Sequence, residues 1–186
     1  HLRKNAQWSD GSPLTAQVFV FGITRALAPS TGTLAEDLLL IRGARAYSNG
    51  EADASALGLE AVDDHTLVIR LEKSSPDLPS LTAGAHYMPC NQSYFESCEG
   101  HYGLSSEYLI TNGPFTFGST YSWQTDSGKR SITVSRSETY QGDHKVQAAS
   151  VTFLIDYDQS YDEDPITALA SGSVDILTLP DDQAQA

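Results

Sequence analysis

The hydrophobic pattern near the start of the chain is that of an amphipathic helix. Apolar residues recur at spacings that place them on one helical face, at Phe19, Ile23, Ala26 and Leu27. Thr15 stands in a favourable N-cap position before this run, and Pro29 ends it. The preceding residues Ser9–Gly11 carry a strong turn signal. The sequence therefore predicts a turn followed by a helix between Thr15 and Pro29.

Signals at the ends of other apolar runs predict further helices. The run from Leu34 to Ala46 is long enough for one continuous helix. Capping residues and glycine stops mark three shorter helices, over 53–57, from Asn91 or Ser93 to Cys98, and from Asp164 to Leu169 before Gly172. The predicted helices are thus concentrated before residue 112, with one more near the end of the sequence.

Alternation of apolar and polar residues predicts strands. One clean alternation lies early, over Thr66–Leu71. After Asn112 the pattern changes to β, with a hairpin over 115–135, an alternating strand over 151–155 and a strand beginning at Val174–Ile176. We therefore expect the α+β class (mixed α/β), with a domain boundary near Asn112.

Four aromatic residues in the first β segment occupy odd positions, so a regular strand places them on one face: Phe115, Phe117, Tyr121 and Trp123. Such a stripe either lines a ligand groove or forms the buried face of a sheet. Buried aromatic faces are the commoner case, so we expect these residues to belong to the core.

The charge of the chain argues against one class of partner. The 186 residues include 24 acidic and 11 basic ones, for a net charge of −13. Phosphates are bound by clustered Lys and Arg, and no basic patch occurs, so we expect no nucleic acid as a partner. The acidity is typical of a solvated surface. No apolar run approaches the roughly 20 residues that cross a bilayer, and no signal peptide is recognised.

Two cysteines occur, Cys90 and Cys98, without the short CxxC spacing of zinc or redox sites. Either both are free, half-buried thiols, or they form one local disulfide in an oxidising compartment. A disulfide requires Cys98, at the end of a predicted helix, to fold back on the residue that precedes that helix. The sequence leaves both alternatives open.

No motif for catalysis or cofactor binding stands out. The five histidines show neither an i, i+4 ligand pair nor HExxH, and the GxxxxGK[ST], GxGxxG and GxSxG motifs are missing. The alternating spacing that begins a calcium loop occurs at Asp156, Asp158, Ser160 and Asp162. However, Tyr161 stands where that loop requires Gly, and Thr167 where it requires Glu. We therefore expect no metal, no cofactor and no catalytic residue.

Taken in order, the motifs of the chain resemble those of one family. HLRKNAQWSDGSPLTAQVFVF is similar to the HLR-x-N-A-x-W-S-D-G-x-P-x-T-A-x-D-F signature of extracytoplasmic solute-binding protein family 5, the oligopeptide- and dipeptide-binding proteins of ABC importers. Further segments resemble that family in the same order: NGEADASALGLEAVDDHTLVIRLEKSSP, EGHYGLSSEYLITNGPFTF, ETYQGDHKVQAASVTFLI and LASGSVDI. The resemblance covers nearly the whole chain and favours the oligopeptide branch over nickel- or haem-binding relatives.

The resemblance implies part of a periplasmic-binding-protein-like type II fold. Residues 1–111 would form mostly the accessory domain, after first residues that end a strand of lobe one. Residues 112–186 would form part of lobe one, a sheet with a hairpin and a helix. Full members of the family are more than twice as long, so we expect the chain to be an internal fragment without the second lobe.

The function implied by the resemblance is the capture of extracellular oligopeptides for an ABC importer, without catalysis. The partners implied are peptides and membrane permease subunits. We expect a monomer outside the cytoplasm (periplasm or cell surface), lipid-anchored in the full-length protein. The alternatives are a peptide sensor that signals, a binder of nickel, haem or another small solute, and an enzyme such as a hydrolase. We expect the fragment itself to bind peptide weakly or not at all, because the group that holds the peptide amino terminus is expected in the second lobe.

The ligand-binding residues that the resemblance implies are Leu34 and Ala35, where some members place an aromatic side chain near the peptide. The family's P-x-P-Y-F becomes Pro76–Ser80 and loses two aromatics, and Gln141 replaces the Trp expected after Tyr140. We therefore expect a less aromatic pocket than in other members.

Overall fold

The computed structural model describes the chain except for residues 32–35, 118–123, 127–128, 143–145, 156–163 and 179–186, and at 124–126 and 129–130 it describes the backbone alone. The chain divides into two compact units, His1–Gly113 with Glu138–His144, and Pro114–Ser137 with Lys145–Ala186. Both units combine helices with antiparallel strands, so the fold is α+β. The assignment of residues 1–111 to an accessory domain and 112–186 to lobe one stays a prediction.

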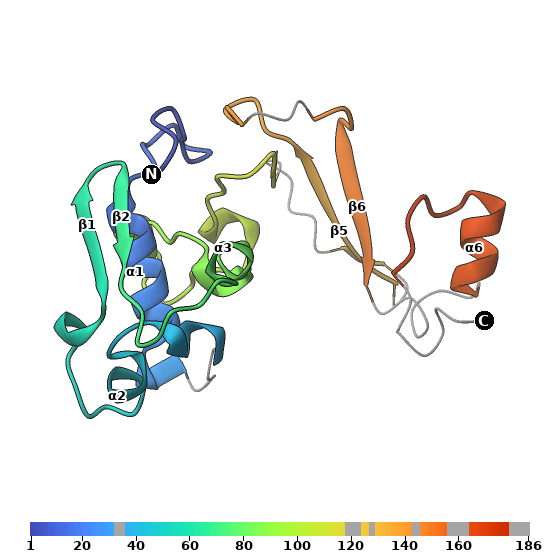
Figure 1. Ribbon diagram of the computed structural model, residues 1–186. Coiled ribbons are helices and arrows are strands. Elements are labelled where there is room, and N and C mark those ends of the chain that lie inside the picture. Colours follow the sequence, from blue (N-terminus) through green and yellow to red (C-terminus); the bar gives the residue numbers. More distant parts are fainter. Residues whose placement is uncertain (32–35, 118–123, 127–128, 143–145, 156–163, 179–186) are drawn as a thin grey trace. The chain divides into compact units, whose positions relative to one another are not determined.

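In the first unit, helix α1 (Ala16–Ala26) packs against the hairpin of β1 (Leu59–Asp63) and β2 (Thr66–Ile69) (Figure 1). Leu59 lies opposite Ile69 in this antiparallel pair, and an irregularity between Ala61 and Asp63 shifts the register near the turn. The alternation predicted from Thr66 onward is confirmed as a strand as far as Ile69.

Helix α1 begins where the sequence predicts, and its first N–H group hydrogen-bonds to a carbonyl of a distant segment. Thr15 is the N-cap residue, and its side chain makes no capping hydrogen bond. The Ala16 N–H donates instead to the Asp64 carbonyl at 2.8 Å, within the turn of the β1–β2 hairpin. The start of the helix is therefore held by tertiary structure rather than by its own cap.

Short helices complete the first unit: η1 (Pro29–Thr31), η2 (Glu36–Leu40), α2 (Ala44–Ser48), η3 (Ala54–Ala56), α3 (Leu78–Leu81), η4 (Ala85–Tyr87), α4 (Gln92–Ser97) and η5 (Ser106–Tyr108). Helix α4 confirms the prediction for its segment. Asn91 is its N-cap, and the side-chain oxygen of Asn91 accepts a hydrogen bond from the Tyr94 N–H at 3.0 Å.

The prediction of one continuous helix over Leu34–Ala46 is wrong. Between η2 and α2 the Arg42 N–H donates a hydrogen bond to the Arg70 carbonyl at 2.8 Å. This segment therefore pairs with the residue that follows β2 instead of continuing a helix. Gly43 then adopts a φ of +76°, in the left-handed region that favours glycine. Pairing with a distant segment thus interrupts an apolar run that reads as a helix.

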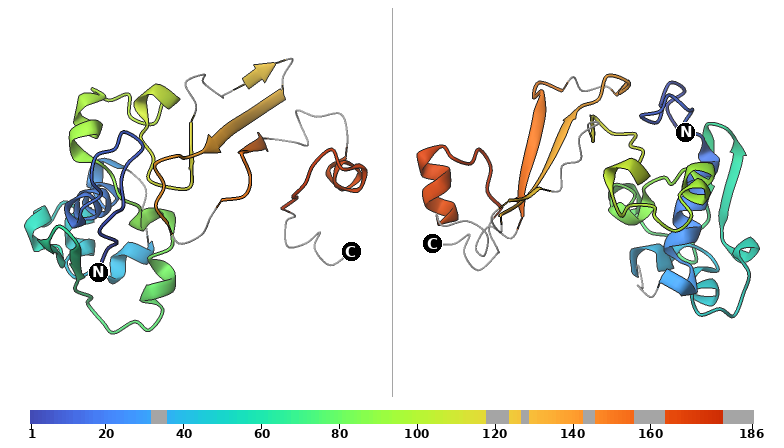
Figure 2. Two further views of the ribbon diagram at one scale, coloured as in Figure 1. Left: turned by 90° about the horizontal axis from the view of Figure 1, so that it is seen from above. Right: turned by 180° about the vertical axis from the view of Figure 1, so that it is seen from behind.

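The sheet of the second unit is built around its longest strand, β5 (Lys129–Arg136) (Figure 2). It pairs antiparallel with β3 (Phe115–Thr116), β4 (Gln124–Asp126) and β6 (Ser150–Ile155). Ile132 lies opposite Phe153 and Val134 opposite Val151, so these four apolar residues share one face. On the other face the Thr133 and Thr152 hydroxyls hydrogen-bond at 2.9 Å.

The predicted hairpin and the predicted strand over 151–155 are therefore confirmed in β3–β6. Of the aromatic stripe, Phe115 and Phe117 are half-buried, whereas Tyr121 and Trp123 lie outside the described residues.

Helix α6 (Pro165–Ser171) has the ends that its sequence predicts. The Asp164 carboxylate accepts a hydrogen bond from the Thr167 N–H at 2.9 Å, and Gly172 ends the helix with a φ of +79°. The strand predicted at Val174–Ile176 is wrong, because this segment pairs with no described strand and leaves Ile176 84% exposed.

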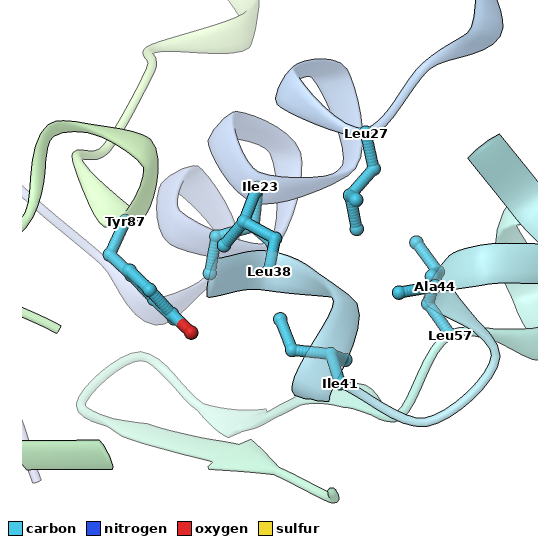
Figure 3. Packing of buried hydrophobic residues seen from close by; sticks show 7 residues of the cluster. All are labelled: Ile23, Leu27, Leu38, Ile41, Ala44, Leu57 and Tyr87. Carbon is cyan, nitrogen blue, oxygen red and sulfur yellow. The ribbon is translucent and has the colours of Figure 1, made fainter. Parts of the chain in front are cut away.

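The main core of the first unit includes Ile23 of α1 and Leu27, the C-cap residue of that helix (Figure 3). Its buried residues come from segments far apart in the sequence: Ile23, Leu27, Leu38, Ile41, Ala44, Leu57 and Tyr87. A second cluster surrounds the buried Trp8, and Phe19 of α1 packs against it. Burial of a large apolar side chain contributes about 1.5–3 kcal/mol. Helix α1 therefore connects both clusters.

At Gly22 the backbone of α1 comes unusually close to the segment that leads into α4. A Cβ atom at this position would lie 2.6 Å from the Met88 carbonyl oxygen and 3.0 Å from the Cys90 nitrogen. Beside it, the Cys90 N–H donates to the Val18 carbonyl at 3.0 Å. Because the neighbouring atoms are backbone, they cannot turn away as a side chain could, and the crossing requires glycine.

We expect Gly22→Ala to lower the free energy of unfolding by about 1–3 kcal/mol through this overlap, although alanine favours a helix by about 1 kcal/mol over glycine. The urea midpoint measures the effect. Gly113→Ala is the matched control, because a Cβ there meets nothing within 4 Å, and its midpoint should stay unchanged. An unchanged midpoint for Gly22→Ala would contradict the close crossing.

Candidate functional site

The predicted ligand-binding residues Leu34 and Ala35 lie outside the described residues, but the chain on either side of them is firmly held. On the N-terminal side, the Thr31 hydroxyl hydrogen-bonds to the carbonyls of Ala28 at 2.6 Å and Arg25 at 3.1 Å. These contacts fold η1 back onto the end of α1. On the C-terminal side, Leu38 of η2 is fully buried in the main core.

Asp37 attaches the same C-terminal side to η4. Its carboxylate lies 2.8 Å from the Nδ1 atom of His86, and its carbonyl accepts a hydrogen bond from the Tyr87 hydroxyl at 3.1 Å. Tyr87 is 3% exposed, and burial, followed by the nearby Asp37 charge, raises the pKa of its hydroxyl. The segment that contains Leu34 and Ala35 is therefore bordered by two anchored ends.

A hollow of about 280 Å³ lies elsewhere in the first unit, where the first residues of the chain meet α1 and residues 140–142. Its lining mixes apolar side chains with amides and includes Leu2, Leu14, Phe19, Asn112 and Gln141. Gln141 is the position at which the family resemblance leads one to expect Trp. A smaller polar side chain therefore borders this hollow.

The two thiols lie at opposite ends of α4. Cys90 precedes the N-cap Asn91, Cys98 is the C-cap residue, and both are buried free cysteines. The sequence leaves open whether these cysteines are free or form a disulfide, and in the structure both thiols are free. The Cys90–Cys98 disulfide is not formed in the structure and stays a prediction.

The Tyr102 hydroxyl is hydrogen-bonded to the Cys90 thiol, and the charge of Arg25 acts on that thiol. The guanidinium carbon of Arg25 lies 4.6 Å from the ring centre of Phe95 and 5.5 Å from that of Tyr102. The rings of Phe95 and Tyr102 meet edge to face at 5.3 Å, and Phe21 packs on Phe95 at 5.7 Å. We call Arg25, Phe95 and Tyr102 the aromatic cover.

Burial raises the pKa of the Cys90 thiol and of the Tyr102 hydroxyl, which are also hydrogen-bonded to each other. A thiol with a raised pKa is mostly protonated at neutral pH and is a poor nucleophile. The pair is therefore unsuited to covalent catalysis as it stands.

Two of the described histidines contact neighbouring side chains. The His101 ring stacks on Tyr108 at 5.2 Å, and His86 faces Asp37. In the part of the chain that the structure describes, no group of three or more His, Cys, Asp or Glu is placed to hold a metal. The acidic run Asp156–Asp162 lies outside that part. None of the described helices has the length and apolar character needed to cross a membrane.

Comparison with known proteins finds one family. The model of the bacterial extracellular solute-binding proteins, family 5 (middle), matches residues 1–186. The periplasmic oligopeptide-binding protein OppA of Escherichia coli is 32% identical over 157 residues, which cover 83% of this chain and 28% of that protein.

Solved structures agree with this match. The substrate-binding domain of an oligopeptide ABC transporter from Bacillus anthracis superposes with a TM-score of 0.77 at 29% identity, covering 93% of this chain and 32% of that one. The pheromone receptor PrgZ, solved with its mode of peptide binding, gives a TM-score of 0.76 at 25% identity, covering 93% and 33%. The chain therefore spans a third or less of the length of these relatives.

The buried thiol and phenols of the first unit predict a loss of stability at alkaline pH. Burial raises the pKa of Cys90 above its ordinary 9.0 and those of Tyr87, Tyr94 and Tyr102 above 10.0. The folded state holds these protons more tightly than the unfolded state. The stabilisation is therefore complete below the unfolded pKa values and is lost as pH rises beyond them.

We expect the melting temperature to fall progressively above about pH 9, as measured by circular dichroism. Tyr102→Phe should show a shallower fall, because one raised phenol is removed. A melting temperature that stays constant up to about pH 11 would show that these groups ionise freely in the folded chain.

Proposed function

The chain belongs to family 5 of the bacterial extracellular solute-binding proteins, and we propose that it supplies part of the peptide-binding component of an ABC importer. The observation that carries the proposal is the match of the family over residues 1–186 together with the oligopeptide-binding relatives. Members of this family bind solutes outside the cytoplasm and are not enzymes. The proposed activity is therefore capture of peptides without catalysis.

A protein that binds peptides of many sequences has to recognise the peptide main chain. An extended peptide that hydrogen-bonds through its backbone, in the manner of an added strand, is held largely independently of its side chains. Closure of two lobes around the peptide then distinguishes the loaded from the empty protein for the permease. In our proposal this chain contributes lobe-one and accessory structure, and the second lobe comes from sequence beyond it.

We propose that residues 1–111 form mostly the accessory domain, after first residues that end a strand of lobe one, and that residues 112–186 form part of lobe one. The division of the chain at Gly113 supports this assignment. So does the exposed apolar surface of the second unit, where Phe153 is 55% and Ile166 56% exposed. A lobe that is completed by further strands would cover such side chains.

We further propose that Leu34 and Ala35 lie near the bound peptide. The support is the family resemblance, together with the anchoring of the chain on both sides by Thr31 and Asp37. An aliphatic residue in place of an aromatic one would leave this part of the pocket wider and less selective for flat side chains. Lipid anchoring of the full-length protein and a monomeric state also belong to this proposal.

A peptide receptor that signals is the second candidate function. The similarity to the pheromone receptor PrgZ favours it, since that protein also binds peptide on this fold. Import and signalling share the peptide-binding step and differ in the partner protein that recognises the closed, peptide-bound form. Loss of peptide uptake on deletion of the gene would favour import, and unchanged uptake with a lost peptide response would favour signalling.

We expect a full-length protein containing this chain to be stabilised by a mixed pool of di- to hexapeptides in a thermal shift assay. A ligand at a hundred times its Kd adds about 2.7 kcal/mol. The 186-residue chain alone is the control and should show little or no shift, because the second lobe is needed to close over the peptide. No shift in either protein would contradict peptide capture, and an equal shift in both would show that this chain binds alone.

Leu34→Tyr in the full-length protein should tighten binding of a peptide with an aromatic side chain by about 0.5–1.5 kcal/mol, because an aromatic pair is restored. Calorimetry with one peptide chosen from the pool measures the change. Leu104→Tyr is the matched control, because Leu104 is 68% exposed in the first unit. Equal affinities of the Leu34 variant and the unaltered protein would place Leu34 away from the peptide.

A further inference from the structure

The two thiols flank helix α4, which holds Cys98 away from the residue that follows Cys90. From the N-cap Asn91 to the C-cap Cys98 the helical rise amounts to about 10 Å. The Cα atoms of a disulfide lie at most about 6.8 Å apart. Because the side chain of Asn91 caps α4, this separation is built into the first unit.

The aromatic cover is linked to Cys90 through Tyr102, whose hydroxyl is hydrogen-bonded to the Cys90 thiol. Cys90 is 5% exposed, whereas Arg25 is an exposed residue near the end of α1 whose guanidinium rests on the rings of Phe95 and Tyr102. The contact bridges two elements, because Arg25 belongs to α1, Phe95 to α4, and Tyr102 to the segment after α4. The Arg25 cation therefore contacts the ring whose hydroxyl is hydrogen-bonded to the buried thiol.

We propose that the aromatic cover keeps Cys90 reduced and unreactive outside the cytoplasm, while α4 prevents its pairing with Cys98. Free thiols are uncommon in oxidising compartments, where accessible pairs become disulfides. A thiol that stays free there must be shielded from small oxidants. In this account Arg25 acts as a lid, and its effect on Cys90 is steric.

Because Arg25 is charged, a steric and an electrostatic role predict opposite changes in the reaction rate of Cys90 when Arg25 is removed. The positive charge favours the thiolate and works against the burial that raises the pKa of Cys90. If Arg25 acted through charge alone, its removal would leave less thiolate and slow the reaction of Cys90. If Arg25 is a lid, its removal must speed the reaction.

The experiment uses oxidised glutathione as the probe, on the folded chain carrying Cys98→Ser. The Cys90 thiolate attacks one sulfur of the disulfide, forms a mixed disulfide with one glutathionyl group, and releases the other as reduced glutathione. Mass spectrometry follows the rate in the Cys98→Ser chain alone and with Arg25→Ala or Arg45→Ala added. Arg45 is likewise an exposed arginine near the end of a helix and serves as the matched control.

We expect Arg25→Ala to raise the rate by about two- to fivefold, the effect of losing a cation–π contact at an exposed site, and Arg45→Ala to leave it unchanged. An unchanged or slower rate in Arg25→Ala overturns the proposal. If Arg25→Ala lowers the melting temperature, Arg25→Lys is compared at the same interval below its own melting temperature. This variant keeps the positive charge but loses the planar guanidinium group that lies on the rings. If Cys90 reacts at the same rate in Arg25→Lys as in the chain with Arg25, the proposal is overturned as well.

The chain with both cysteines provides a second readout. It should remain a dithiol in oxidised glutathione under native conditions and form the Cys90–Cys98 disulfide only when denaturant unwinds α4. Formation of that disulfide in the native chain would show that the helix does not hold the thiols apart.

Discussion

The close crossing at Gly22 is the constraint on which the first unit depends. It lets the backbone of α1 touch the segment before α4, so that the Cys90 N–H reaches the Val18 carbonyl at 3.0 Å. The next residue, Ile23, and the C-cap residue Leu27 enter the main core, while Arg25 lies over the rings of Phe95 and Tyr102. A side chain at position 22 would push the two elements apart and weaken all of these contacts together.

Local signals allowed several elements to be predicted from the sequence. Asn91 caps α4, and Asp164 and Gly172 bound α6, because each acts on backbone groups only a few residues away. Predictions fail where a distant segment supplies the partner. The Arg42 N–H pairs with the Arg70 carbonyl and interrupts an apparent helix, and the Asp64 carbonyl accepts the first N–H of α1, a partner that no local signal indicates.

The site was less predictable than the fold for the same reason. Leu34 and Ala35 were inferred from a family resemblance, because no local pattern marks a residue that touches a peptide. The anchors beside them depend on Tyr87, fifty residues from Asp37 in sequence. The aromatic cover likewise unites Arg25 with Phe95 and Tyr102, whose ring contacts no helical or strand period could indicate.

Buried apolar residues are distributed very unevenly between the two units. In the described part of the chain, Ala168 is the only buried hydrophobic residue of the second unit, and all the others belong to the first. The apolar face of β5 and β6 therefore gains little hydrophobic stabilisation from the described residues. Among the described residues, Phe153 and Ile166 of the second unit are 55% and 56% exposed. The similar oligopeptide ABC transporter domain from Bacillus anthracis is about three times as long as this chain, so its additional sequence is where apolar surface that covers such a face is to be sought.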